Sequence, residues 1–282
     1  MSTNASHTQL YTDLSGYYDL LCADIDYHAQ SNGIRRLHQI FGGYNNSDRN
    51  DRSSDRSDRK THLDLGCGTG PHVRHFIDFG YHSNGLDIHQ PMLDIATTRC
   101  PEAHFYLQDM SQFTVAEPLN LITCFLYSIH YNQGIKKLKE CIASVHRALT
   151  TDGVFCFNAV DKNKIDNNLC VKHTVNKNDA SFTFQSGWHF SGQGEQQSLQ
   201  LSIEKTTIVS NKKTDANNTT QTKANNDTQI WHDEHTMVAF DFDQLVGLLT
   251  AHFDVHVFES DYKKIIPWDK KSGNAIFVCV KK

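Results

Sequence analysis

The chain has 282 residues, a hydrophobic content of 38% and a formal net charge of −5. This length suits one large α/β domain with an inserted lobe, and the hydrophobic content is sufficient for a core. The net acidity argues against a general nucleic-acid binder, which would carry a basic face. The eight cysteines form no Cys-x-x-Cys pair, which argues against zinc ribbons and redox motifs and indicates reduced thiols.

The first part of the chain predicts helices followed by a polar segment. Residues 10–41 carry apolar side chains at three- and four-residue spacing, which is typical of amphipathic helices. The segment 45–60, NNSDRNDRSSDRSDRK, contains no apolar residue and has nothing to bury. We therefore expect an N-terminal helical cover and, after it, a flexible linker.

The next part of the chain alternates between strand-like and helix-like segments. The predicted strands are THLDLG, SNGLDI, AHFYLQD, LNLITCFLYS and GVFCFNAV, and the helices among them are GPHVRHFIDFG, QPMLDIATTRC and GIKKLKECIASVHRALT. This rhythm predicts a Rossmann-like, doubly wound, mostly parallel seven-stranded sheet with helices on both faces.

The alternation stops near Val160. Residues 181–209 and 229–240 carry strand patterns without intervening helices and predict an inserted antiparallel β lobe. A helix, DFDQLVGLLTAHF, and two strands, FDVHVFES and NAIFVCVKK, then close the chain. The predicted division is a helical cover (1–44), a flexible linker (45–60), a core (61–160 and 239–282) and a β lobe (161–238) with a mobile tip (211–229).

Neither end of the chain nor its histidines indicate a membrane or a metal. The start, MSTNASHTQLYTD, lacks the basic and apolar regions of a signal peptide, and no apolar run approaches the roughly 20 residues of a membrane helix. The tightest histidine groups, HVRH (His72, His75) and HDEH (His232, His235), lack further ligands at suitable spacing. We expect no metal and a soluble, cytoplasmic protein that binds neither membrane nor nucleic acid; the sequence leaves a homodimer open.

The loop after the first predicted core strand, GCGTG, is suited to bring backbone close to a ligand. A phosphate-binding P-loop would need Lys followed by Ser or Thr after the glycines, and neither is present. A dinucleotide fingerprint would need glycine where Pro71 stands. This departure weakens the hypothesis of an NAD-dependent oxidoreductase without excluding it.

Three blocks in order, LDLGCGTG, GLDIHQPML and FYLQDM, resemble the class I S-adenosylmethionine-dependent methyltransferases. The resemblance implies S-adenosyl-L-methionine as the cofactor. Asp87 would accept the ribose hydroxyls, Ile88 would lie against the adenine, and Asp109 would accept from the adenine amino group beside a backbone contact from Met110. Taken singly, each acid could equally be a helix cap or a turn residue. The implied cofactor-binding residues are Tyr27, Asp64, Gly66, Cys67, Gly68, Gly70, Asp87, Ile88, Asp109, Met110 and Phe125.

The stretches GYYDLLCADIDYHAQ, CGTGPHVRHF and FLYSIHY and the late β insert are similar to N,N-dimethyltransferases of nucleotide-linked amino sugars. This resemblance implies that Tyr18 shields the methyl-transfer site and that Tyr27 holds the methionine end of the cofactor. His130 is the nearest match to a histidine beside the substrate nitrogen, where an imidazole would suit the role of base. A shift of one residue in that loop would make Tyr131 the functional residue instead.

The expected function is therefore transfer of a methyl group to a small-molecule acceptor, with an amine favoured over hydroxyl acceptors. The β lobe would bind this substrate, although it lacks a basic cluster suited to a pyrophosphate. Two other classes stay open, a non-catalytic S-adenosylmethionine-binding module and the NAD-dependent oxidoreductase. Binding of NAD would favour the latter.

Overall fold

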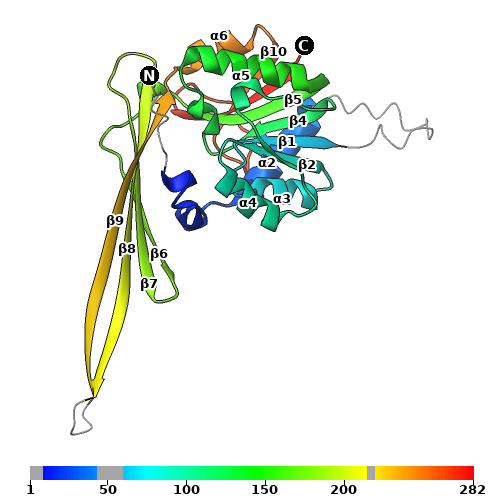
Figure 1. The fold of residues 1–282 in the computed structure, drawn as a ribbon. Coiled ribbons are helices and arrows are strands. Elements are labelled where there is room, and N and C mark those ends of the chain that lie inside the picture. Colours follow the sequence, from blue (N-terminus) through cyan, green and yellow to red (C-terminus); the bar gives the residue numbers. More distant parts are fainter. Residues whose placement is uncertain (1–8, 43–59, 215–219) are drawn as a thin grey trace, which may run out of the picture.

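The computed structural model describes residues 9–42, 60–214 and 220–282, which form two sheets (Figure 1). The larger sheet has seven strands in the order β10-β11-β5-β4-β1-β2-β3. Strands β1 to β5 run parallel to one another, and β11 is antiparallel to both β5 and β10. The predicted mostly parallel seven-stranded sheet is confirmed. Its strands are β1 (Thr61–Leu65), β2 (His82–Asp87), β3 (Phe105–Leu107), β4 (Leu119–Cys124), β5 (Leu149–Val160), β10 (Phe253–Glu259) and β11 (Asn274–Lys281).

Helices cover both faces of this sheet, as the alternation of strands and helices predicts. Along β5, Phe155 and Phe157 pack with α5 and α6 on one face, while Val154 and Cys156 pack with α2 and α3 on the other. Burial on both faces explains why the strands are continuous apolar runs. The helices are α1 (Tyr18–Leu21), α2 (Tyr27–Phe41), α3 (Pro71–Asp78), α4 (Gln90–Arg99), α5 (Ile135–Ala148) and α6 (Phe242–Leu249), with 3₁₀ turns η1 (Gln9–Tyr11), η2 (Ser15–Tyr17), η4 (Met110–Gln112), η5 (Ser128–Tyr131) and η6 (Lys162–Lys164).

Local signals set where several of these helices begin. The Asp26 carboxylate accepts a hydrogen bond from the backbone N–H of Ala29 at the start of α2. Asp241 does the same for Gln244 in α6, and Pro71 occupies the first turn of α3, where its missing N–H costs no hydrogen bond. Among the described residues, no helix is long and apolar enough to cross a membrane.

The smaller sheet is antiparallel and contains β6 (Val171–Lys177), β7 (Ala180–His189), β8 (Gln196–Thr214) and β9 (Thr220–Val238). Figure 1 shows β8 and β9 as a long hairpin that projects away from the core. The antiparallel lobe is confirmed, but β6 was not among the predicted strands.

Residues 211–214 and 220–229, which lie within the predicted mobile tip, are paired strands in the structure. The pairing of β8 with β9 continues from Lys205 opposite Gln229 to Thr214 opposite Thr220. Strand pairing satisfies backbone N–H and C=O groups even where the side chains are polar, so a polar composition did not end the strands. Residues 215–219, and all of the predicted linker 45–60 except Lys60, lie outside the described residues.

The N-terminal segment packs on both sheets. Leu10 and Leu14 are buried against Phe182, Phe184 and neighbouring side chains of the β lobe. Further along the chain, α2 packs on the core sheet. The segment therefore runs from the lobe to the core, past the carboxyl ends of the parallel strands.

Candidate functional site

A cavity of about 620 Å³, partly open to solvent, lies at the carboxyl ends of β1, β2 and β3. This edge is where open α/β sheets bind their ligands. Side chains from η1, α1, α4, η4 and η5 complete its walls. The residues predicted from the sequence that line this cavity are Tyr18, Gly66, Gly68, Asp87, Ile88, Asp109, Met110 and Tyr131.

The glycine loop forms one wall of the cavity. Gly66 and Gly68 have φ angles of 63° and 54°, a region that side chains other than glycine rarely adopt. A Cβ atom at Gly66 would lie only 3.0 Å from the Cβ of Ser128. Gly70 lines neither this cavity nor the second one described below; it precedes α3 with a φ of 80°, and a Cβ there would lie 3.1 Å from that of Ala96. Gly70 therefore allows close packing of the loop against α4, and its cofactor contact stays a prediction.

Asp87 is fixed at the end of β2. Its two carboxylate oxygens accept hydrogen bonds from the backbone N–H groups of Gly68 (3.0 Å) and His89 (2.9 Å). The residue is 8% exposed, whereas the neighbouring Ile88 is 60% exposed. The cavity wall thus combines an oriented carboxylate with an accessible apolar surface.

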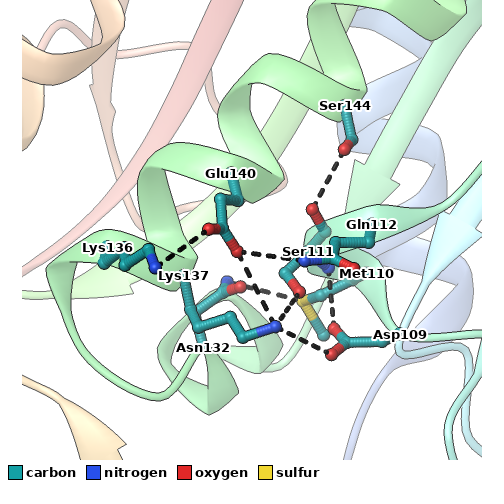
Figure 2. A network of polar contacts seen from close by, with 9 residues as sticks. All are labelled: Asp109, Met110, Ser111, Gln112, Asn132, Lys136, Lys137, Glu140 and Ser144. Atoms are coloured by element: carbon teal, nitrogen blue, oxygen red, sulfur yellow. Dashed lines mark hydrogen bonds and ion pairs between the residues drawn. The ribbon is translucent and has the colours of Figure 1, made fainter.

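Asp109 also lines this cavity and lies within a network of polar contacts (Figure 2). One carboxylate oxygen accepts from the Ser111 N–H at 2.8 Å and caps η4, while the other lies 3.6 Å from the Lys137 ammonium. Lys137 also donates to the Ser111 hydroxyl (3.1 Å) and lies 3.7 Å from Glu140. Asp109 therefore has a structural capping role and lines the cavity as well.

A second, smaller cavity of about 260 Å³ adjoins the first, and Tyr18, Gly66 and Ser128 line both. The predicted residues Tyr27, Asp64, Cys67 and Phe125 line the second cavity. Tyr27 Oη and His72 Nε2 are buried there without a hydrogen-bond partner, apart from the weak Cys22 thiol beside the tyrosine. Because buried polar atoms are normally satisfied, these two atoms indicate a place for polar ligand groups.

His72 was not among the predicted site residues. Its ring stacks on Phe125 at 3.6 Å between centroids, and its Nδ1 lies 3.0 Å from the Ser31 hydroxyl. Burial lowers the pKa of His72 well below its usual value, so the ring is neutral. The sequence signal that could have identified His72 as a site residue is its position directly after the glycine loop and Pro71.

Asp64, at the end of β1, is 1% exposed and accepts a hydrogen bond from the Thr123 hydroxyl at 2.7 Å. Burial raises the pKa of this carboxyl group to about 7, and the nearby Asp87 acts in the same direction. Asp64 can therefore change its charge near neutral pH beside the second cavity.

The base role predicted for His130 does not fit its surroundings. His130 is fully buried, and neither cavity includes it. Its Nδ1 lies 2.9 Å from the Val238 carbonyl, and its Nε2 accepts from the Val160 N–H at 3.0 Å. Burial lowers its pKa to about 4. These contacts join β5 to β9 through a neutral ring and do not support the predicted base role.

Tyr131, the alternative to His130, does line the first cavity. Its hydroxyl lies 2.6 Å from that of Tyr11, which lines the same cavity and was not predicted. The Tyr18 ring also contacts that of Tyr11, with 5.7 Å between the ring centroids. Within the described ranges, no group of three His, Cys, Asp or Glu side chains could hold a metal ion.

The sequence is similar to methyltransferases. Residues 63–153 match a family described as a methyltransferase domain. Over 92 residues the chain is 32% identical to a dTDP-4-amino-2,3,4,6-tetradeoxy-D-glucose N,N-dimethyltransferase of Saccharopolyspora spinosa, an alignment covering 33% of this chain and 37% of that protein. A dTDP-3-amino-3,6-dideoxy-alpha-D-glucopyranose N,N-dimethyltransferase of Streptomyces fradiae is 34% identical over 92 residues, 33% of this chain and 36% of that protein. The aligned part thus spans little more than a third of these relatives.

The fold is also similar to solved structures along the whole chain. DesVI of Streptomyces venezuelae superimposes with a TM-score of 0.73 and 20% identity, covering 96% of this chain and 99% of that one. CalS10, an amino pentose methyltransferase from Micromonospora echinaspora, gives a TM-score of 0.68 and 16% identity over 100% of both chains. The core sheet and the antiparallel lobe are therefore parts of one shared fold.

Proposed function

We propose, on the premise that residues 63–153 form a methyltransferase domain, that this protein transfers a methyl group from S-adenosyl-L-methionine to a small-molecule amine. One observation carries the proposal. An oriented carboxylate, an exposed apolar side chain and a left-handed glycine loop surround one cavity, and unpartnered polar atoms lie in the adjoining one. A ligand with an adenosine at one end and an amino acid at the other requires these features.

The adenosine end fits the first cavity. Asp87 accepts the ribose hydroxyls through a carboxylate already oriented by two backbone N–H groups. Ile88 offers its exposed side chain to the adenine, and Asp109 accepts from the adenine amino group. Hydrogen bonds to charged acceptors are worth about 1.5–3 kcal/mol each, so Asp87 dominates this end.

The methionine end fits the second cavity. The Asp64 carboxylate suits an ammonium group, and the Tyr27 hydroxyl and His72 Nε2 suit further polar atoms of the amino acid. Tyr18 lines both cavities and would shield the point between them, where the methyl group is transferred. Cys67 and Phe125 are buried and complete the wall.

When bound, S-adenosylmethionine supplies a methyl group on a sulfonium, which is already activated toward displacement. The residues of this chain therefore have to orient the two reactants and exclude water. A protonated amine has no lone pair, so a proton has to leave it before attack. Tyr131 and Tyr11 are on the cavity wall where such an acceptor would meet the donor.

The acceptor class that we propose is an amino sugar linked to a nucleotide. The names of three sequence relatives support this class, because each of the three specifies a dTDP-linked amino sugar and N,N-dimethylation. The β lobe, packed against the N-terminal segment beside the cavity, would bind the remainder of the substrate.

Calorimetry tests the cofactor, followed by an assay of methyl transfer. S-Adenosylmethionine and S-adenosylhomocysteine should bind, NAD should not, and dTDP-linked amino sugars should be methylated. Replacing Asp87 by Ala should weaken cofactor affinity by at least ~10-fold. Asp94→Ala is the matched control, because Asp94 is exposed on α4, lines neither cavity and pairs with Gln90.

Each other outcome favours a different class. Binding of NAD would favour the oxidoreductase. Cofactor binding without turnover of any amine would favour a non-catalytic binding module. Unchanged affinity in folded Asp87→Ala would remove Asp87 from the cofactor site.

A further inference from the structure

A continuous chain of hydrogen bonds leads from the first cavity into the β lobe. The Tyr11 hydroxyl lies 2.6 Å from the Tyr131 hydroxyl, which in turn lies 2.5 Å from Nδ1 of His235. Nε2 of His235 lies 3.1 Å from a carboxylate oxygen of Asp233. The first two of these contacts join residues more than a hundred positions apart, so the tertiary fold assembles the chain.

The two ends of this chain have different surroundings. Tyr11 and Tyr131 line the cavity that also contains Asp87. His235 is fully buried, and the Asp233 side chain is 12% exposed. Asp233 and His235 are two residues apart on β9 and therefore point to the same face of the strand. They belong to the HDEH segment, which the proposed function does not otherwise use.

The hydrogen-bonding partners fix the direction of the chain. An ionised Asp233 can only accept, so Nε2 of His235 carries the proton and Nδ1 has a free lone pair. Tyr131 then donates its hydroxyl proton to Nδ1, while its oxygen accepts from the Tyr11 hydroxyl and keeps a second lone pair for a donor in the cavity. Asp233 also accepts from the Leu10 N–H at 3.0 Å, which keeps the carboxylate oriented.

The charges around His235 favour a neutral ring that can take up a proton. Burial lowers the pKa of His235, His89 acts in the same direction, and Asp233 opposes both. Burial raises the pKa of Tyr131 well above its usual value, with Tyr11, Asp233 and Asp87 adding to the effect. Tyr131 therefore passes a proton on rather than storing a negative charge.

We propose that Tyr131, His235 and Asp233 form a proton relay that deprotonates the amine acceptor. The proposal rests on the proposed function.

The ammonium N–H bond breaks and its electron pair becomes the lone pair that attacks the methyl group. The proton goes to Tyr131 Oη, while the hydroxyl proton of Tyr131 goes to His235 Nδ1. The resulting imidazolium is paired with Asp233 and loses its extra proton to solvent after product release. Tyr131 is the catalytic residue, and His235 and Asp233 act through it.

The first test is kinetic and uses His235→Asn in the full chain. Asn offers an oxygen to the Tyr131 hydroxyl but cannot take up a proton. We expect kcat to fall about 10²-fold or more, with KM and cofactor affinity within about threefold. The kcat of the parent protein should rise with pH as the relay becomes neutral, and the variant should lose this limb. Tyr131→Phe should reproduce the loss of kcat, and it provides the test if the Asn variant does not fold.

The matched control is His173→Asn. His173 lies on β6, stacks on Phe184, and places Nε2 3.4 Å from the Leu20 carbonyl, away from both cavities. Like Asp233, which contacts Leu10, His173 contacts the N-terminal segment, but it lines neither cavity. Its variant should retain the kcat and the pH profile of the parent protein.

The second test needs no turnover. Imidazole ¹⁵N NMR of the cofactor-free protein should show the His235 proton on Nε2 and a lone pair on Nδ1. A proton on Nδ1 would overturn the relay, as would full kcat with an unchanged pH limb in His235→Asn. A parent protein that methylates no amine would overturn the proposed function, and the relay with it. Because a failure of the proposed function is seen in the parent protein, it is distinguishable from a failure of the relay, which is seen in the variants.

Discussion

The core sheet and the β lobe differ in how their strands are buried. In β1 and β4 nearly every residue is buried, because helices cover both faces of the sheet. In β6 most residues are exposed, and in β7 only Phe182 and Phe184 are buried. A strand buried on both faces holds the loop at its end in one position, whereas a half-exposed strand tolerates changes in its side chains. The core therefore holds the cavity-lining loops in fixed positions, which is what the lobe's strands are less suited to do.

The two regions meet at a few buried polar side chains. His130 bridges the backbone of β5 and β9, and His235 connects β9 to Tyr131 of η5. Both histidines are fully buried, yet only the second is connected to the cavity. This difference separates a structural histidine from one that we propose to be functional.

The largest effect is expected from a substitution at the junction between the core sheet and the β lobe. His130→Ala removes the partners of the Val160 N–H and the Val238 carbonyl, both in the buried junction. Because each of these two buried groups costs about 1–3 kcal/mol when left unsatisfied, we expect the free energy of unfolding to fall by about 2–6 kcal/mol. Urea unfolding measures it, with the exposed His104→Ala as control. A stable variant with slow turnover would instead restore the base role of His130.

The ionisation of Asp64, in the core, should change cofactor affinity about tenfold per pH unit. Its raised pKa means that, without a ligand, its contribution to stability is present below about pH 4 and lost as the pH rises through about 7. A cationic ligand group reverses this preference, because it favours the carboxylate. Cofactor affinity should therefore rise about tenfold per pH unit below pH 7 and level off above it. Calorimetry from pH 5 to 8 measures the slope, and Asp64→Asn should abolish it. A parent affinity independent of pH would exclude a charged contact at Asp64.

The smallest effect is expected from deleting part of the polar segment 45–60. The segment 47–57 consists of Ser, Asp, Arg and Asn and has no apolar side chain to bury. Deleting it should change the free energy of unfolding by no more than about 0.5 kcal/mol and leave cofactor affinity unchanged. Thermal unfolding and calorimetry check both quantities. A large loss of either would show that this segment docks onto the core.

The sequence pattern predicted the core better than the lobe. Continuous apolar runs such as VFCFNAV mark strands buried on both faces, and this burial is a property of each segment by itself. The strand β6, VKHTVNK, is largely exposed and carries few apolar residues, so its composition resembles a loop. The polar ends of β8 and β9 are held by backbone pairing, which leaves no trace in side-chain pattern.

For the site, the sequence by itself determined the residues that one strand and its following loop bring to the sheet edge. The glycine loop, Asp87 and Asp109 all follow strands of the parallel sheet, so their convergence is a consequence of the alternation. Only the tertiary structure showed that His130 and Tyr131, which are adjacent in sequence, face different surroundings: His130 is fully buried and Tyr131 lines the cavity. It alone also joined Tyr131 to Tyr11 and His235, because hydrogen bonds across more than a hundred residues depend on how the two sheets pack.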